Sequence, residues 1–425
     1  MVRVRIAPSP TGFAHVGNAY AALFNYAFAK QHNGVFVLRF EDSDVKRNVK
    51  GAEEAIFDGL KWLGLTWDEG TDVGGSYGPY RLSERLDIYN QKAQELVKMG
   101  KAYEDKGAIR FKDPHEEISW IDHIRGKISF PPGEITDFVM IKSDGFPTYS
   151  FAVCVDDILM KITHVIRGEE HISNTPRQLA IYKSFGVKPP EFAHFPTLRN
   201  AQHQKLSKRR DPVNLKLYKD EGYLPEALIN FLCLLGWSHP EEKEIFTLEE
   251  FIKKFSLDRV KKAGPVFDIK KLEWMNGMYI RQAKLDELSE KLKVQSFDKA
   301  QDKNEKFKNI KDEEFRKIVA IAQSRIKTLN EFSDLVMPFV EGHSVLLTDQ
   351  EKAVGKDILS SLSSVSSWDK ETVFQAIRCV LDAKGARMSL AYKIFTGKEY
   401  GLPLADVLEV FGKDKALSFL QKIIS

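Results

Sequence analysis

The sequence predicts an α/β fold over the first half of the chain and an all-helical second half. Three observations support this. A strand, a loop and a helix follow one another at 3–20, where Pro8, Pro10 and Gly12 break the strand pattern. Strand and helix patterns then alternate to about residue 215, which is typical of a parallel sheet covered by helices. From Leu224 onward, apolar residues recur at helical spacing.

Composition limits the class of protein. A chain of 425 residues is long enough for about two to four domains. Hydrophobic residues make up 43% and charged residues 29%, as in globular proteins. The net charge is only +3, so bulk charge does not predict a nucleic-acid partner. Any such partner must bind local basic patches.

Cysteines and apolar runs exclude further classes. Cys154, Cys233 and Cys379 are widely spaced, so we expect neither a disulfide framework nor a zinc site. The N-terminus has no charged-apolar-small leader, and no apolar run is long enough for a membrane span. We therefore expect a cytoplasmic protein without a membrane partner.

The first stretch places polar groups at a helix start. The strand at 2–6 alternates apolar residues with Arg3 and Arg5, and the helix begins near His15 and Gly17. A helix start offers free N–H groups to phosphate, and glycine admits a base or ribose close to the backbone. Taken alone, these residues equally fit an ordinary strand-turn-helix in which His15 only caps.

The remaining elements follow from pattern. We expect buried strands at 35–40, 164–167 and 193–198, and helices at 52–63 and 83–99. Strands at 108–112, 137–142 and 147–153, the last two joined by a turn at Asp144-Gly145, predict a β-rich insertion. Helices are expected at 224–235, 267–281 and throughout 314–424, after an exposed Lys- and Asp-rich linker at 294–311.

Charged residues end several of the expected strands. Glu41 and Asp42 follow the second strand, and Arg5 and Arg167 lie at the ends of two others. The carboxyl ends of parallel strands form the ligand-binding edge of open α/β sheets. Two arginine forks suit a substrate carboxylate and not a neutral amide. An acidic helix start, or arginines paired with structural carboxylates, are the alternatives.

A basic loop follows the last expected strand. Residues 205–210 read KLSKRR, after a polar loop at 199–204. Alone, such a loop fits a solvated surface or an RNA-contacting patch better than a catalytic element.

Together, HVGN at 15–18 and KLSKR at 205–209 resemble the HIGH and KMSKS signatures of class I aminoacyl-tRNA synthetases. Longer stretches resemble the bacterial type of glutamyl-tRNA synthetase, namely RIAPSPTG, LFNYAFAK, RFEDSD, LKWLGLTWDEG, GPYRLSER, KSDGFPTY, HVIRGEEHISNTP and GPVFDIKKLEWMNGMYIR. The resemblance extends to about residue 280 and becomes weaker beyond it.

The resemblance implies an organisation. It gives a Rossmann-type catalytic domain at 1–101 and 156–215, split by an insertion at 102–155 that binds the tRNA acceptor end. A helical stem-contact region at 216–293 and an all-α anticodon-binding domain at 294–425 follow. The implied enzyme is a monomer.

The resemblance also implies an activity. The family ligates L-glutamate to tRNA(Glu) through a glutamyl-adenylate and releases AMP and pyrophosphate. ATP brings Mg²⁺ without a dedicated protein site, and no zinc is expected.

The resemblance assigns roles to residues of this chain. Those implied to bind glutamate are Arg5, Ala7, Ser9, Glu41, Tyr149 and Arg167. Those implied to bind ATP are His15, Gly17, Glu170, Leu198, Lys205, Leu206, Ser207, Lys208 and Arg209, of which His15, Lys205 and Lys208 are the catalytic set. Arg325 and Lys393 are implied to contact the anticodon, although a solvated helix face is the default for either.

The chain departs from the family in three places. The segment after Tyr103 is short, Val153 stands where the family often has asparagine, and Lys393 stands in a shortened segment where an arginine is usual. Because of the lysine at 393, a form that also glutamylates tRNA(Gln) is the main alternative. A glutaminyl-tRNA synthetase, a truncated tRNA-modifying relative and a non-catalytic tRNA-binding paralogue are less consistent with the arginine pair, the extra domain and the retained motifs.

Overall fold

The structure, a computed structural model, describes the backbone of residues 1–43, 48–207, 210–298, 307 and 310–425. Lys208 and Arg209 of the basic loop therefore lie outside the described residues. The chain forms two compact units. The first unit comprises Met1–Tyr218 and Pro225–Ile269, and the second comprises Lys219–Leu224 and Lys270–Ser425.

The first unit is built on parallel strands. β1 pairs in parallel with β2, and β2 with β3, while β9 pairs in parallel with β10, and β10 with β6. β7 is antiparallel to β6 at the edge. These strands are β1 (Arg3–Ile6), β2 (Val35–Leu38), β3 (Glu69–Gly70), β6 (Ile118–Asp122), β7 (Gly126–Phe130), β9 (His164–Gly168) and β10 (Glu191–Phe195).

β1 and β9 lie side by side in the middle of this arrangement. The N–H of Thr163, just before β9, donates to the Arg3 carbonyl at 2.9 Å, and the Arg3 N–H donates to Thr163 Oγ1 at 2.8 Å. The strands therefore run in the order β3-β2-β1-β9-β10-β6-β7. The chain order reverses between β1 and β9, where doubly wound sheets bind their ligands.

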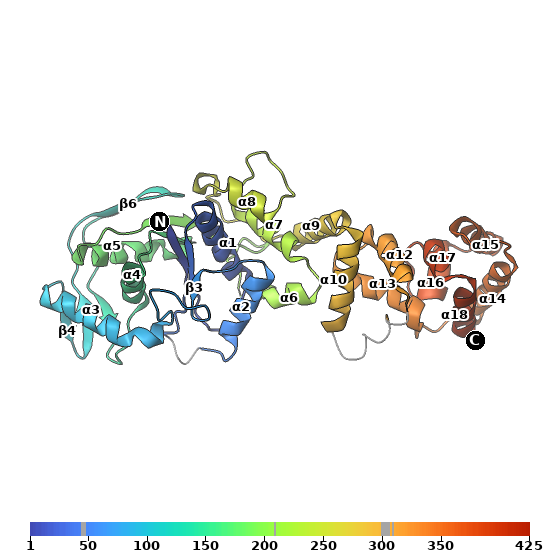
Figure 1. The fold of residues 1–425 in the computed structure, drawn as a ribbon, viewed down its shortest axis with the longest axis horizontal. Helices are drawn as coiled ribbons and strands as arrows, with labels where there is room; N and C mark the ends of the chain where they lie inside the picture. The colour runs from blue at the N-terminus through green and yellow to red at the C-terminus, as the bar shows by residue number, and fades with distance from the viewer. Residues whose placement is uncertain (44–47, 208–209, 299–306, 308–309) are drawn as a thin grey trace. The chain divides into compact units, whose positions relative to one another are not determined.

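Helices cover this sheet (Figure 1). α1 packs Tyr20 and Phe24 against Phe195 of β10, with ring centroids 5.1 and 5.5 Å apart. The helices of the first unit are α1 (Val16–Gln31), α2 (Ala52–Trp62), α3 (Leu86–Lys98), α4 (Tyr149–Leu159), α5 (Thr175–Ser184), α7 (Pro225–Gly236) and α8 (Leu248–Lys254), with α6 (Leu215–Asp220) at the junction. Short 3-10 turns, η2 (Leu82–Arg85) and η3 (Glu169–Asn174), precede α3 and α5, and η4 (Leu257–Arg259) follows α8.

The insertion is β-rich, as predicted, but one expected strand is wrong. β4 (Ala102–Asp105), β5 (Ala108–Phe111) and β8 (Phe138–Ile141) form an antiparallel sheet. The strand expected at 147–153 is instead the start of α4, which begins at Tyr149 after an extended Thr148. Residues 150–157 are all buried, so the apolar run has no face pattern from which a strand and a buried helix can be distinguished.

The pairing of β6 with β10 was not anticipated from the sequence. In β6, Ile118, Trp120 and Asp122 are buried and the two residues between them are exposed. This is the alternation of a half-buried strand. The inserted hairpin thus extends the parallel sheet, and it places Asp122 beside β10.

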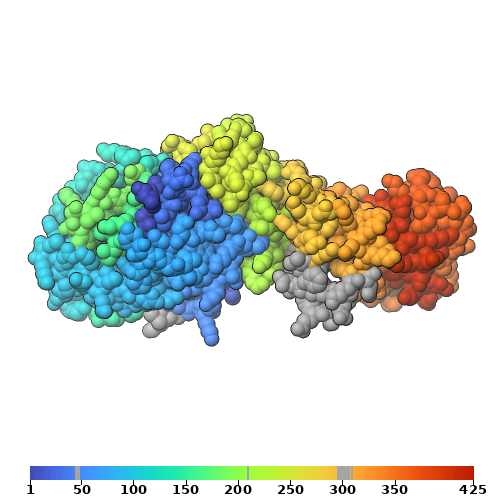
Figure 2. Space-filling view, viewed as in Figure 1, coloured from blue at the N-terminus to red at the C-terminus, as the bar shows by residue number. Residues whose placement is uncertain are grey.

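The second unit is all-helical in its described part, as predicted. Its helices are α9 (Ile269–Gln282), α10 (Leu285–Asp298), α12 (Asp312–Gln323), α13 (Leu329–Glu341), α14 (Asp349–Ser364), α15 (Lys370–Ala383), α16 (Met388–Thr396), α17 (Leu404–Phe411) and α18 (Lys413–Ile424). α14 packs against α15 and α18 near the C-terminus (Figure 1), in the part of the chain that is coloured orange to red in Figure 2.

The first residues of the linker expected at 294–311 are helical instead. α10 continues through Asp298, because Leu288 and Leu292 are buried four residues apart and anchor the helix just upstream. Residues 299–306 and 308–309 of this stretch lie outside the described residues.

A buried ion network joins α4 to the first two strands. Asp157 accepts from Arg5 Nε at 3.1 Å and Arg5 Nη2 at 3.0 Å, and from Arg39 Nη1 at 2.7 Å. All three side chains are buried. A carboxylate bonded to two arginines offsets the cost of burying them only while it stays charged.

We predict that Asp157→Asn destabilises the first unit. The amide keeps the shape but leaves two buried guanidinium groups without their counter-charge, at a cost of about 3–5 kcal/mol. Urea-dependent hydrogen exchange of α4 peptides measures this loss. Glu116→Gln, which breaks the exposed pair of Glu116 with Lys183, is the matched control and should cost less than about 1 kcal/mol. Equal effects of the two variants would contradict a structural role for Asp157.

Candidate active site

A cavity of about 470 Å³ opens at the carboxyl ends of β1 and β9. This volume lies in the range of small-molecule sites. Its lining includes ten of the residues predicted from the sequence, namely Arg5, Ala7, His15, Gly17, Tyr149, Arg167, Glu170, Leu198, Lys205 and Leu206. The topology therefore brings together segments from four separate parts of the chain.

Three described candidates for glutamate or ATP binding do not line the cavity. Ser9 is exposed on the loop after β1. Glu41 is buried, with Oε1 3.9 Å from Arg39 Nη2. Ser207 is held by a contact within the basic loop, because its N–H donates to Asp211 Oδ2 at 2.7 Å. The two remaining candidates, Lys208 and Arg209, lie outside the described residues.

His15 both caps α1 and lines the cavity. Its Nδ1 accepts the N–H of Asn18 at 3.3 Å, and the Asn18 side chain accepts the His15 N–H at 3.2 Å. A Cβ on Gly17 would lie 2.9 Å from the same Nδ1, so glycine is required for the cap as well as for an open helix start. The helix start faces the cavity and can receive an anion.

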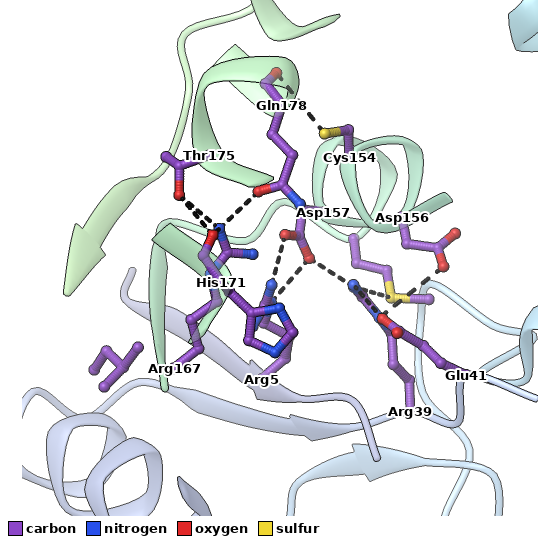
Figure 3. Close-up of polar contacts among 12 residues, drawn as sticks. Arg5, Arg39, Glu41, Cys154, Asp156, Asp157, Arg167, His171, Thr175 and Gln178 are labelled. Atoms are coloured by element: carbon purple, nitrogen blue, oxygen red, sulfur yellow. Dashed lines mark hydrogen bonds and ion pairs between the residues drawn. The ribbon is translucent and has the colours of Figure 1, made fainter. Parts of the chain in front are cut away.

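Arg167 is buried in the cavity wall with only neutral partners among the described residues. Its Nη2 donates to Thr175 Oγ1 at 2.9 Å and to Gln178 Oε1 at 2.8 Å, both on α5 (Figure 3). Its Nη1 lies 3.5 Å from the hydroxyl of Tyr149. The side chain is 6% exposed, so a full positive charge is buried without a carboxylate from the described chain. Such a charge is costly unless a ligand supplies the anion.

Arg5 differs from Arg167 in this respect. It is directed toward Asp157 of α4, with which it forms a two-point ion pair (Figure 3). The expectation that two arginines converge on one cavity is met in position, because both line it. However, the alternative of a structural ion pair also applies to Arg5, whose charge is shared with Asp157.

His171 was missed by the sequence analysis. It lines the cavity, and its ring centroid lies 5.2 Å from that of Tyr149. Burial and the neighbouring Arg167 lower the pKa of His171 to about 4. The imidazole is therefore neutral near pH 7 and adds no charge to the cavity. A single histidine in GEEHISN has no spacing signal by which sequence reasoning could have selected it.

Glu41 has an unusual electrostatic environment. Burial raises its pKa to about 7, although Arg39 and Arg5 oppose the shift. Its Oε1 has no hydrogen-bond partner among the described residues. A buried carboxylate with an unused acceptor can bind a cation that enters beside it.

The basic loop contacts the cavity through Lys205. Lys205 Nζ lies 3.1 Å from Glu170 Oε1 at an exposed edge. The Leu206 N–H donates to the Leu198 carbonyl at 3.0 Å, which fixes the base of the loop against the cavity wall. An exposed lysine pair of this kind is weak, so Lys205 can exchange Glu170 for another anion.

The anticodon candidates lie in the second unit. Arg325 is exposed, just after α12. Lys393 of α16 is half-buried, and its Nζ lies 2.5 Å from Glu351 Oε1. These two basic residues are therefore not equivalent, since one charge is already paired.

The part of the chain that the structure describes contains no group of three or more His, Cys, Asp or Glu arranged to hold a metal. Within the same residues, no helix has both the length and the apolar content that a membrane span requires.

Family models match most of the chain. Residues 1–108 and 104–274 match the model of the tRNA synthetases class I (E and Q), catalytic domain, and residues 285–424 match that of an anticodon binding domain. The two catalytic segments meet at the tight β4–β5 hairpin, where the sequence after Tyr103 is short.

Curated relatives are similar over their full length. The glutamate–tRNA ligase 1 of Fervidobacterium nodosum is 39% identical over 469 residues, with 98% of this chain and 97% of the relative covered. The glutamate–tRNA ligase of Carboxydothermus hydrogenoformans is 40% identical over 475 residues, with 98% of each covered. Both alignments are longer than the chain, so these relatives contain residues that it lacks.

Solved structures agree. A glutamate tRNA ligase from Elizabethkingia meningosepticum, crystallised in complex with its amino acid, superposes with a TM-score of 0.84 at 31% identity. The superposition covers 100% of this chain and 99% of the Elizabethkingia meningosepticum chain. The glutamate-tRNA synthetase of Elizabethkingia anophelis gives 0.81 at the same identity and coverage. The resemblance seen in the sequence is confirmed, and the chain belongs to the glutamate–tRNA ligase family of class I aminoacyl-tRNA synthetases.

Proposed function

We propose that the cavity between β1 and β9 binds L-glutamate and ATP and joins them as glutamyl-adenylate, which the enzyme then transfers to tRNA(Glu). Family membership supports the ATP-dependent ligation of glutamate to tRNA. The roles of individual residues, given below, are proposals that follow from their positions around the cavity. The cytoplasmic location and monomeric state expected from the sequence are part of the same proposal.

One observation supports this assignment above all others. Arg167 has a buried positive charge, no carboxylate partner among the described residues, and a place in the cavity wall. The side-chain carboxylate of glutamate would supply the missing anion through charge-assisted hydrogen bonds. Tyr149 and Arg5 line the same part of the cavity and would complete the carboxylate site. Glutamine would present an NH₂ to these donors.

The other end of glutamate requires different groups. Its ammonium would bind the buried carboxylate of Glu41 and the hydroxyl of Ser9, after a small movement because neither lines the cavity as it stands. Ala7 at the end of β1 is small enough for the ligand to lie against the backbone.

ATP would occupy the α1 side of the cavity. Gly17 would admit the adenosine, with Glu170 and Leu198 beside it, and His15 would contact the phosphates at the helix start. An oxygen of the α-carboxylate of glutamate attacks the α-phosphorus of ATP and forms an O–P bond, while the bond from that phosphorus to the α,β-bridging oxygen breaks and pyrophosphate leaves. Lys205 and Lys208 would neutralise the charge that develops on the leaving group, while Leu206, Ser207 and Arg209 complete the loop. Mg²⁺, which arrives on ATP, would add further charge neutralisation.

Catalysis therefore requires positioning and charge stabilisation, with no enzyme nucleophile. In the second step, a hydroxyl of the terminal adenosine of tRNA attacks the glutamyl carbonyl and releases AMP. The insertion at 102–155 would bind the acceptor end, 216–293 the stem and 294–425 the anticodon, in keeping with the anticodon-binding model matched at 285–424.

The first functional prediction concerns the choice of amino acid. The unmutated enzyme should support ATP–pyrophosphate exchange with glutamate far better than with glutamine, assayed with and without tRNA. Arg167→Ala should lower kcat/KM for glutamate by about 100-fold, because two charged hydrogen bonds of about 1.5 kcal/mol each are lost. Arg177→Ala on α5, outside the cavity lining, is the control. Equal use of glutamine by the unmutated enzyme would refute the carboxylate site.

The second functional prediction concerns the pH dependence of glutamate binding. An ammonium group favours the ionised form of Glu41, whose pKa is about 7 in the free protein. Binding is therefore complete above pH 7 and is lost as the pH falls below it. We expect KM for glutamate in the exchange assay to rise between about pH 8 and 6 by up to tenfold per pH unit. Glu41→Gln should have a higher KM with a flatter profile. A profile that is the same in both proteins would exclude Glu41 from amino-group binding.

The third functional prediction concerns the choice between tRNA(Glu) and tRNA(Gln). Arg325 is exposed and able to contact the third anticodon base, whereas Lys393 is paired with Glu351. We expect preference for tRNA(Glu) over tRNA(Gln), and a roughly tenfold loss of that preference in Arg325→Gln, since a good base contact contributes about 1–3 kcal/mol. Lys393→Gln, the paired comparison, should change the ratio less. The assay is charging of both transcripts, and an unchanged ratio in Arg325→Gln would make Arg325 a solvated surface residue.

A further inference from the structure

His194 of β10 contacts the guanidinium of Arg167 from behind the cavity. Arg167 Nε donates to His194 Nε2 at 3.1 Å, and His194 Nδ1 lies 2.5 Å from Asp122 Oδ2. Both His194 and Asp122 are essentially unexposed. The three side chains come from β6, β9 and β10, which are adjacent strands of one sheet.

The geometry defines the tautomer of His194. Arg167 Nε always carries a hydrogen, so His194 Nε2 must accept and cannot itself be protonated. The proton of the neutral imidazole is therefore on Nδ1, where it donates to Asp122. Thr175 Oγ1, 3.3 Å from Nε2, faces the same lone pair. A protonated His194 would place an N–H against the N–H of Arg167.

Asp122 is itself fixed in place by the backbone. Its Oδ1 accepts the N–H groups of Ile124, Arg125 and His194 at 3.0, 3.0 and 3.1 Å. Although burial opposes ionisation, hydrogen bonds from His194 and from these N–H groups hold the pKa of Asp122 below its ordinary value. Burial lowers the pKa of His194, against the effect of Asp122. The pair is thus a carboxylate and a neutral imidazole.

We propose that Asp122 and His194 are positioning residues of the glutamate site. Asp122, on the inserted hairpin, would select the His194 tautomer that accepts from Arg167 Nε and so orient the guanidinium. With Nε on His194 and Nη2 on Thr175 and Gln178, the remaining Nη1 edge is directed toward Tyr149 and the substrate. This inference rests on the proposed role of Arg167 and adds the groups that align it.

Asp122→Asn is the most direct test. The amide can keep the three backbone hydrogen bonds at its oxygen and then presents an NH₂ to His194 Nδ1. Nδ1 must accept, the proton moves to Nε2, and a donor faces Arg167 Nε. We expect KM for glutamate to rise roughly tenfold, as for loss of one charged hydrogen bond. KM for ATP and the thermal midpoint of unfolding should change little. If Asp122 had only a structural role, these two quantities would change as well.

The matched control is Glu191→Gln. Glu191 is the exposed first residue of β10, the strand that carries His194, and its carboxylate contacts His123. This variant should leave KM for both substrates unchanged. If Asp122→Asn leaves KM for glutamate unchanged, or raises KM for both substrates alike, the proposal is overturned.

A second pair of variants covers a folding defect in Asp122→Asn. His194→Gln retains an acceptor for Arg167, whereas His194→Phe does not. The proposal requires KM for glutamate to be closer to normal in the glutamine variant, and the reverse order would contradict it. Ring ¹⁵N shifts of His194 in the unmutated protein report the tautomer independently of activity. If the unmutated protein activates no glutamate at all, the proposed function fails, whereas a protonated Nε2 in an active enzyme overturns only this inference.

Discussion

The ion pair of Asp157 with Arg5 and Arg39 is the interaction on which the site depends. It ties α4, which contributes Tyr149, to the ends of β1 and β2. Asp156, the preceding residue, accepts from Arg85 Nε at 2.7 Å and from the Tyr89 hydroxyl at 2.8 Å, so the same helix also holds η2 and α3. Removal of one carboxylate from such a network leaves buried cations uncompensated.

The buried arginines in and near the cavity wall therefore differ in whether a carboxylate balances their charge. Arg5 and Arg39 share Asp157 of α4, and Arg85 pairs with Asp156 of the same helix, whereas Arg167 has only neutral partners among the described residues. The neutral His171 preserves this imbalance. The uncompensated positive charge of Arg167 in the cavity wall favours a ligand carboxylate at that position, which is how an α-amino dicarboxylic acid would be oriented.

Much of the fold and site was predictable from the sequence because local signals coincided with the parallel-sheet edge. The helix start at His15, the strand ends at Arg5 and Arg167, and the helical second half all followed from periodicity and turn residues. The strand expected at 147–153 failed because a fully buried helix has no polar face. Asp122 and His194 were not found because their relation exists only through the pairing of β6 with β10, between strands far apart in sequence. Asp157, the ionic partner of Arg5, was likewise not found, because the two residues lie 152 positions apart and meet only in the folded chain.

The pairing of β6 with β10 also bears on how this enzyme can diverge. Insertions within a domain are usually exchangeable modules, since they project from the surface and leave the host core intact. Here the inserted hairpin supplies an outer part of the sheet, and Arg125 in its turn donates to the His194 carbonyl and to Glu169. Replacement of this hairpin by that of another synthetase would therefore also alter the proposed amino-acid pocket. With the proposed roles of the insertion and the cavity, changes in acceptor-end recognition and in substrate selectivity would be constrained to evolve together in this part of the chain.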